Sequence, residues 1–501
     1  MSAPGSGPLR FLLNGASVEV EGVAPQVTLL DWLREQRQLT GTKEGCAEGD
    51  CGACTVAIAE ARGERLAWTT ANACLRLLPS VDGKAVFTVE SLADAGALHP
   101  AQQAMVDCHG SQCGFCTPGF VMSLFGLYKR APRPSRDAAC DALSGNLCRC
   151  TGYRPILDAA VRMYDLPPPG DWRAPGLAPD GSPRPSDGER ALAQRLAALR
   201  RAGTYEYAAA GQRWIAPATA EAFAAARVAH PDATIVAGAT DVGLWVTKAH
   251  RDLGTILYAG AAAELARIER DAHGLGIGAA ATLEDAFAAL DADFPELSET
   301  WARFASPAIR AGGTLGGNVA NGSPIGDAMP VLIALGATVE LRRAGHERSL
   351  PLEDFYVGYR RTALGGGEFV RAIRVPARPR ALRLRAYKVG KRHDQDISAV
   401  FACFALRVDA GRIAGARIGC GGVAPVPARA RRTEAALAGR PFVEATFAAA
   451  ADELAQEFTP IDDMRASAAY RRTVLGNLLR RFWHETGASH GAPVRVADVK
   501  A

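Results

Sequence analysis

Long apolar runs are missing from this sequence: none reaches the ~18 residues that a membrane-spanning helix needs. Net charge is also nearly absent, at +4, which argues against partners such as nucleic acid or a membrane surface. The first seven residues have no basic stretch followed by an apolar one, so no export signal is expected. We therefore expect a cytoplasmic protein, in a compartment where thiols stay reduced.

Cysteine is scarce in most of the chain, since only two of the twelve lie beyond residue 150. No repeat of fixed period is present, and the apolar (48%) and charged (22%) fractions are those of an ordinary globular protein. A chain of 501 residues is expected to form three or four domains. The thiol chemistry is therefore concentrated in the N-terminal part.

Eight of the N-terminal cysteines form two sets of four. The first set has the C-x4-C-x2-C…C spacing of plant-type [2Fe–2S] proteins. The second has C-x2-C and, after a gap, C-x-C. Two four-thiolate sites favour a protein that passes electrons one at a time. The first quartet is Cys46, Cys51, Cys54 and Cys74, and the second quartet is Cys113, Cys116, Cys148 and Cys150.

Disulfides and structural zinc are the alternatives for these cysteines. A disulfide framework fits poorly with a long chain that has no secretory signal. Four-thiolate zinc sites usually consist of paired CxxC knuckles, and neither quartet has two such pairs. Residues 45–54 are mostly glycine and other small residues, which suits a backbone that wraps closely round two irons. We interpret both quartets as iron–sulfur sites.

The quartets lie in segments of different pattern. Residues 9–90 predict a small mixed sheet, with Asn14-Gly15 as a hairpin turn and a helix over 28–34. Residues 91–165 predict helices over 100–109, 118–128 and 155–164. Residues 166–203 predict a linker, because seven prolines and four glycines in 167–188 favour an extended, semi-rigid chain.

The remaining chain predicts two α+β domains, over 204–383 and 384–490, with strands over 398–406 and 412–419. Two glycine-rich stretches, residues 236–243 and 311–318, follow strand-like or apolar runs, where backbone N–H groups can approach a pyrophosphate. Neither is a G-x-G-x-x-G motif with an acidic partner, which disfavours an NAD-type Rossmann domain. Beside two clusters, they favour FAD, which accepts single electrons and delivers pairs.

Four motifs resemble those of the xanthine dehydrogenase family of molybdenum hydroxylases. They are GCAEGDCGACT (45–55), QCGFCTPG (112–119), GNLCRCTGY (145–153) and GTLGGNVANGSPIGD (313–327). The likeness covers residues 9–165 and 204–490. It implies an α+β multidomain fold: a β-grasp ferredoxin-like [2Fe–2S] domain, a helical-bundle [2Fe–2S] domain, an FAD-binding domain of the vanillyl-alcohol-oxidase type and a C-terminal flavoprotein domain.

The resemblance also implies roles for single residues. The first quartet would ligate the cluster nearer the flavin, and the second quartet the cluster nearer the molybdenum, with Gln112 and Cys150 beside the pterin. Phe304 would face the flavin ring. The other residues expected to bind FAD are Val236, Ala237, Gly238, Ala239, Thr240, Asp241, Val242, Gly243, Thr314, Asn318, Asp327, Val370 and Lys388.

Five further residues match no such role. Cys108, Cys140, Cys403 and Cys420 are expected to be ordinary small buried residues. His109 lies near a ligand, and a structural role is at least as plausible for it as a redox role.

The molybdopterin domain of that family is missing from these residues, so no catalytic residue is expected here. The resemblance implies an obligate large molybdopterin-binding subunit, in a heterotetramer of two small and two large subunits. Electrons from hypoxanthine and xanthine oxidation would pass through two [2Fe–2S] clusters to FAD and then to NAD⁺, which is favoured over dioxygen as the acceptor. The alternatives are an aldehyde- or N-heterocycle-oxidising relative, a non-enzymatic electron-transfer or assembly protein, and a zinc-stabilised scaffold.

Overall fold

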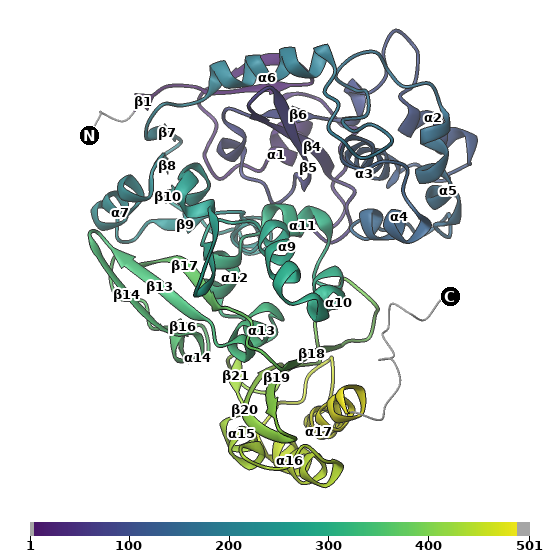
Figure 1. The fold of residues 1–501 in the computed structure, drawn as a ribbon. Helices are drawn as coiled ribbons and strands as arrows, with labels where there is room; N and C mark the ends of the chain where they lie inside the picture. Colours follow the sequence, from purple (N-terminus) through teal and green to yellow (C-terminus); the bar gives the residue numbers. More distant parts are fainter. Residues whose placement is uncertain (1–4, 488–501) are drawn as a thin grey trace. The chain divides into compact units, whose positions relative to one another are not determined.

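The computed structural model describes residues 5–487, which fold into two compact units. The first unit extends to Ala263 and includes Ser306–Gly313, and the second consists of Glu264–Ala305 and the chain from Thr314 on. Figure 1 labels their elements. No helix within residues 5–487 is both long and apolar enough to cross a membrane.

The first unit begins with a five-stranded mixed sheet in the order β3-β2-β6-β4-β5. The predicted hairpin is confirmed: Asn14 and Gly15 have positive φ angles of 52° and 84°, as the tight turn between β2 and β3 requires. The predicted helix over 28–34 is α1 followed by a π-helical turn to Gln36. The elements are β2 (Leu9–Leu13), β3 (Ala16–Val20), α1 (Leu29–Asp31), β4 (Thr55–Arg62), β5 (Arg65–Asn72) and β6 (Ala85–Phe87).

A helical region follows, as predicted. Its helices share one apolar core with the outer face of the preceding sheet. Pro118 lies in the first turn of α3, where a missing N–H removes no hydrogen bond. The helices are α2 (Pro100–Asp107), α3 (Thr117–Arg130), α4 (Arg136–Leu143) and α5 (Arg154–Arg162).

The predicted linker, residues 166–203, packs against the first sheet and contains a helix, contrary to the expectation from its composition. Trp172 stacks on Phe87 with ring centroids 4.2 Å apart, which fastens the segment to the sheet. Helix α6 (Asp187–Leu199) then packs along β4 and β5 (Figure 1), and its Glu189 accepts a hydrogen bond of 3.0 Å from the indole of Trp68. An aromatic stack and a buried hydrogen bond therefore hold this part of the chain against the first sheet.

His99 ties α2 to the same segment. Its Nδ1 accepts the N–H of Ala101 (3.1 Å), so its Nε2 carries the proton and donates to the carbonyl of Arg173 (3.2 Å). Burial lowers the pKa of His99 to about 4. The neutral imidazole is thus the form that the fold requires.

This histidine predicts a loss of stability in mild acid. The unfolded chain takes up the His99 proton below pH ~6.5 while the folded chain stays neutral to about 4, so stability falls with pH across that window. At pH 5 we expect a loss of about 2 kcal/mol relative to pH 7 from this residue. Urea unfolding at both pH values measures it. His99→Gln cannot titrate, and an unchanged pH dependence in that variant would contradict the assignment.

The first unit ends with a second sheet in the order β1-β7-β8-β10-β9. Strands β8, β9 and β10 are parallel, so their carboxyl ends lie at one edge of the sheet. The elements are β1 (Gly5–Ser6), β7 (Tyr205–Ala209), β8 (Gln212–Ala216), α7 (Ala220–Ala229), β9 (Thr234–Val236), α8 (Val242–Thr247), β10 (Thr255–Tyr258) and α11 (Pro307–Gly312).

The second unit contains an antiparallel sheet in the order β11-β12-β17-β13-β14. Helices α9, α12 and α13 contribute to the apolar core of this sheet. The elements are β11 (Ile268–Asp271), β12 (Gly274–Gly278), α9 (Leu283–Asp293), α10 (Ser298–Ala302), α12 (Leu315–Asn321), α13 (Ala328–Leu335), β13 (Thr338–Arg343), β14 (His346–Pro351), α14 (Leu352–Phe355), β15 (Tyr356–Gly358), β16 (Arg361–Thr362) and β17 (Phe369–Pro376).

Its C-terminal part is a four-stranded sheet covered by helices. The strands predicted over 398–406 and 412–419 are confirmed as β19 and β20. The elements are β18 (Leu382–Val389), β19 (Val400–Asp409), β20 (Arg412–Gly421), β21 (Ala428–Arg429), α15 (Arg431–Leu437), α16 (Glu444–Glu457) and α17 (Ala468–Thr486).

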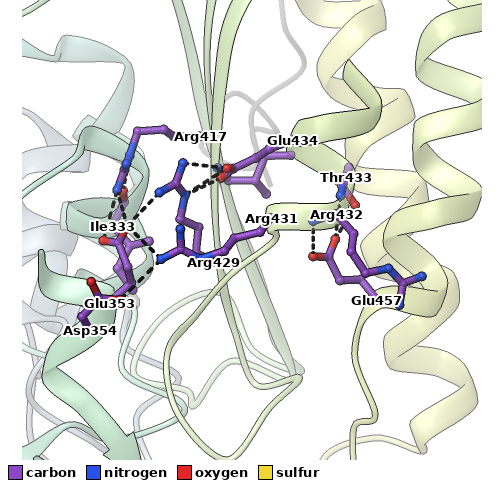
Figure 2. A network of polar contacts seen from close by, with 11 residues as sticks. Ile333, Glu353, Asp354, Arg417, Arg429, Arg431, Arg432, Thr433, Glu434 and Glu457 are labelled. Atoms are coloured by element: carbon purple, nitrogen blue, oxygen red, sulfur yellow. Dashed lines mark hydrogen bonds and ion pairs between the residues drawn. The ribbon is translucent and has the colours of Figure 1, made fainter. Parts of the chain in front are cut away.

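A polar network joins the two parts of this unit (Figure 2). The buried carboxylate of Glu353 on α14 accepts hydrogen bonds from Arg417 on β20 and Arg429 on β21, each at 2.9 Å. Arg429 also pairs with Glu434 on α15. Burial opposes ionisation of Glu353, but a backbone N–H and these guanidinium groups hold its pKa below the usual range. The network therefore fixes the C-terminal sheet against α14.

Candidate iron–sulfur and flavin sites

The first quartet lies in a loop that wraps back on itself. Three of its cysteines precede β4, and Cys74 follows β5. Cys46 Sγ accepts backbone N–H groups from Glu48, Asp50 and Cys51 at 3.3–3.4 Å. Positive φ angles at Gly49 (79°) and Gly52 (69°) allow this turn. Three backbone N–H groups are thus aimed at this sulfur, as hydrogen bonds to a cluster ligand would require.

The cysteines of the second quartet lie in two connections between helices. Cys113 and Cys116 lie between α2 and α3, and Cys148 and Cys150 lie between α4 and α5. The Sγ atom of Cys150 is 3.6 Å from that of Cys113 and 3.9 Å from that of Cys148. Cys113 and Cys150 are exposed to solvent. This quartet is therefore at the surface of the unit.

Two side chains that the sequence did not single out support the second quartet. Thr151 Oγ1 is 3.1 Å from the Sγ of Cys148, and the hydroxyl of Tyr153 accepts the backbone N–H of Cys148 at 2.9 Å. Burial raises the pKa of Cys148, but the hydrogen bonds from Thr151 and the neighbouring backbone outweigh it and lower the pKa to about 7. The thiolate is the form that ligates a metal.

In each quartet, one pair of sulfurs has a spacing that suits two thiolates on one metal ion. Tetrahedral metal–thiolate bonds of ~2.3 Å place two sulfurs on one metal ~3.7 Å apart. The Cys54–Cys74 pair (3.3 Å) and the Cys113–Cys150 pair (3.6 Å) are close to that spacing. Within residues 5–487, no three His, Cys, Asp or Glu side chains converge as they would on a single ion. Ligation of iron by all eight thiols stays a prediction.

The remaining cysteines correct one expectation. Cys403 and Cys420 are fully buried in β19 and β20, and burial raises the pKa of both thiols. Cys108 is half-buried, and Cys140 is exposed on α4. The expectation of buried residues is therefore wrong for Cys140, because it lies on the solvent face of a short amphipathic helix. His109 is also exposed, with a φ of 54°.

The expected pyrophosphate loop, residues 236–243, connects β9 to α8 in the first unit. Gly238 lies against Gly312 so closely that a Cβ on Gly238 would be 1.8 Å from the Gly312 carbonyl oxygen. A small pocket beside these two glycines is also lined by Asn72, Arg76 and Thr240. The need for glycine at position 238 and the pocket beside it both suit a loop whose backbone N–H groups can contact a ligand.

This loop and helix lie directly against the first quartet. A Cβ on Gly243 would be 3.0 Å from the carbonyl oxygen of Leu75, the residue after Cys74. Thr247 Oγ1 donates to the carbonyl of Ala47 at 2.7 Å, and the Lys248 ammonium donates to the carbonyl of Cys46. Neither contact was anticipated from the sequence, because 200 residues separate the partners.

In the second unit, Thr314 and Asn318 lie at the start of α12. Thr314 caps the helix by accepting the N–H of Gly317 at 3.1 Å. The buried Oδ1 of Asn318 has no hydrogen-bond partner within the described residues. A buried polar atom of this kind needs a partner, and a cofactor hydrogen bond would supply one.

Asp327 and Lys388 form a buried ion pair in the same unit. Lys388 Nζ is 2.7 Å from Asp327 Oδ2, and only 4% and 5% of the two side chains are exposed. Ser398 completes the group, donating to Asp327 Oδ1 (2.7 Å) and accepting from Lys388 (3.0 Å). No signal singled out Ser398, the first residue of the strand predicted over 398–406, and the observed strand begins two residues later at Val400. The structure thus brings two predicted residues together with one that was missed.

Phe304 and Val370 are placed differently. Phe304 packs edge-on against Phe287 at 5.0 Å and is only partly buried. Val370 is 7% exposed, and its side chain belongs to the sheet core, so a cofactor contact would involve its backbone. Both assignments stay predictions.

Comparison with protein families matches four models to successive parts of the chain. They are a 2Fe-2S iron–sulfur cluster binding domain (11–77), a [2Fe-2S] binding domain (88–161), an FAD binding domain in molybdopterin dehydrogenase (206–378) and a CO dehydrogenase flavoprotein C-terminal domain (385–486).

Similar curated proteins are longer than this chain. Xanthine dehydrogenase of Emericella nidulans is 34% identical, over 95% of this chain and 38% of its own length. Xanthine dehydrogenase/oxidase of Gallus gallus is 31% identical (96% and 40%), and nicotinate hydroxylase of Emericella nidulans is 30% identical (96% and 41%). The chain therefore spans about two fifths of the length of these relatives.

A solved structure resembles part of the chain. Carbon monoxide dehydrogenase from Hydrogenophaga pseudoflava matches with a TM-score of 0.51 and 27% identity, over 54% of this chain and 94% of that one. The domain models define an iron–sulfur flavoprotein, and the predicted α+β multidomain fold class is confirmed. The chain belongs to the molybdenum hydroxylase family, of which it forms the iron–sulfur and FAD part.

Proposed function

We propose that the chain is the small subunit of a xanthine dehydrogenase. It relays electrons from a molybdenum centre on a large molybdopterin-binding subunit through two [2Fe–2S] clusters to FAD, which passes electron pairs to NAD⁺. The eight quartet cysteines ligate the clusters, and the residues predicted above bind FAD. The assembly contains two small and two large subunits and works in the cytoplasm, where thiols stay reduced.

One observation carries the direction of the relay. The first quartet lies against the dinucleotide loop and α8, through Thr247 and Lys248. The second quartet has two exposed cysteines, Cys113 and Cys150. An external electron donor can therefore approach the second quartet, while the first lies beside the proposed flavin loop. This arrangement supports the order donor, second quartet, first quartet, FAD.

Hypoxanthine and xanthine are the proposed substrates of the assembly, which would yield urate. The similarity to xanthine dehydrogenases of two organisms over almost the whole chain supports this choice. The nicotinate hydroxylase, 30% identical over the same span, supports oxidation of another N-heterocycle as the second candidate.

The test is activity of the purified chain with and without its molybdenum partner. Together they should reduce NAD⁺ with xanthine, and the chain alone should not. Reduction with nicotinate but not xanthine would favour the second candidate. Xanthine oxidation by the chain alone would contradict the requirement for a partner.

A further inference from the structure

The two quartet loops touch through their backbones. The N–H of Leu147 donates to the carbonyl of Cys51 at 2.9 Å. Leu147 directly precedes Cys148, so one hydrogen bond and one peptide unit connect a cysteine of the first quartet to a cysteine of the second. No side chain stands between the two ligands along this route.

Glycines make this close approach possible. A Cβ on Gly52 would be 2.2 Å from the carbonyl oxygen of Gly145, and a Cβ on Gly119 would be 2.2 Å from the carbonyl oxygen of Gly52. Real Cβ atoms do not approach oxygens so closely, and Gly52 also has a φ of 69°. Gly52 and Gly119 therefore both need to be glycine for the loops to meet.

Asn146 lies where the two quartet loops meet. Its Nδ2 donates to the carbonyl of Gly52 (3.1 Å) and to Thr55 Oγ1 (3.3 Å), and its Oδ1 accepts from Ser123 Oγ (2.6 Å). The residue is only 5% exposed. Both amide protons and the oxygen thus have partners, on three different elements of the unit. An apolar or acidic side chain of similar size cannot make the bonds to the first loop.

We propose that Asn146 is a positioning residue that fixes the two cluster loops against each other, so that the Leu147–Cys51 hydrogen bond is the route for the electron between clusters. The inference rests on the proposed function. At each passage the cluster of the second quartet is oxidised by one electron and that of the first is reduced by one, with no proton moved. A buried, fully hydrogen-bonded amide holds this geometry more rigidly than loop packing alone.

The test compares Asn146→Ala with Gln212→Ala in the iron-loaded chain. Gln212 is the matched control: it is also a buried amide of the first unit (7% exposed) with both ends hydrogen-bonded, to the N–H of Gln26 and to Asp252, but it contacts neither quartet loop. After reduction with dithionite, both clusters are paramagnetic and their spin–spin splitting reports their separation and orientation. We expect the splitting to be lost in Asn146→Ala and kept in Gln212→Ala.

A second variant and a second readout complete the test. Asn146→Asp keeps the bond from Ser123 but cannot donate to Gly52, so it should lose the splitting as well. With the molybdenum partner, flavin reduction should be roughly tenfold slower. Replacing a residue that supports a metal ligand typically lowers activity by about 10- to 100-fold. Unchanged splitting in both Asn146 variants, or loss of iron from them, would overturn the inference. A wild-type chain without iron would instead contradict the proposed function.

Discussion

Replacement of Cys148 with serine is expected to stop NADH formation by the assembled enzyme while FAD stays bound. A serine hydroxyl is a poor ligand for iron beside three thiolates, so the second cluster should not assemble. The first quartet and the dinucleotide loop do not depend on this cysteine, since their contacts run through Cys46, Leu75 and Ala47. Iron should fall from about four to about two per chain, with flavin absorbance unchanged.

Cys140→Ser is the matched control for this variant. Cys140 lies on α4, in the same helical region, but is exposed and outside both quartets. It should keep full iron content and activity. Loss of FAD together with iron in Cys148→Ser would contradict the relay and would point to a purely structural role for the second quartet.

Replacement of Asp327 with alanine is expected to destabilise the second unit and to lower the FAD content of the purified protein. The change leaves the buried Lys388 ammonium without its anionic partner, and breaking a buried ion pair typically costs about 3–5 kcal/mol. Urea unfolding gives the loss of stability, and absorbance of the purified protein gives the flavin content.

A double variant separates the two effects. Asp327→Ala combined with Lys388→Met removes both charges, so much of the lost stability should return. FAD content should stay low, because both predicted cofactor contacts are gone. Normal FAD content in the double variant would show that the pair is structural and does not hold the cofactor.

Local signals in the sequence predict much of the N-terminal half. Asn14-Gly15 readily adopts the two positive φ angles of a tight hairpin turn, and Pro118 marks a helix start. The cysteine spacings predict which thiols lie close together, because a cluster restricts the number of residues between its ligands. Each of these signals acts over a few residues, so it can be recognised without knowledge of the fold.

The Pro/Gly-rich segment shows where composition misleads. Its prolines favour an extended chain, but Trp172 stacks on Phe87 and Arg173 is buried against Asp171 and Asp94. Such long-range packing outweighs local preference and leaves no pattern in the segment itself. Ser186, which caps α6, and the spacing of Leu192 and Leu196 were the available signals for the helix that follows.

The roles of Asn146 and Ser398 illustrate the same limit at the sites. Asn146 stands within a quoted motif, but its partners Gly52 and Ser123 are 94 and 23 residues away. Ser398 meets Asp327 across 71 residues. A single sequence gives no measure of such pairs, because they form only when the strands and helices that carry them have packed.

The most direct test is metal and flavin analysis of the purified chain. Two [2Fe–2S] clusters and one flavin predict about four irons, about four acid-labile sulfides and about one FAD per chain, with the brown colour of iron–sulfur protein. A colourless protein that holds zinc, or one with far fewer irons than thiol quartets require, would contradict the electron relay on which every other proposal depends.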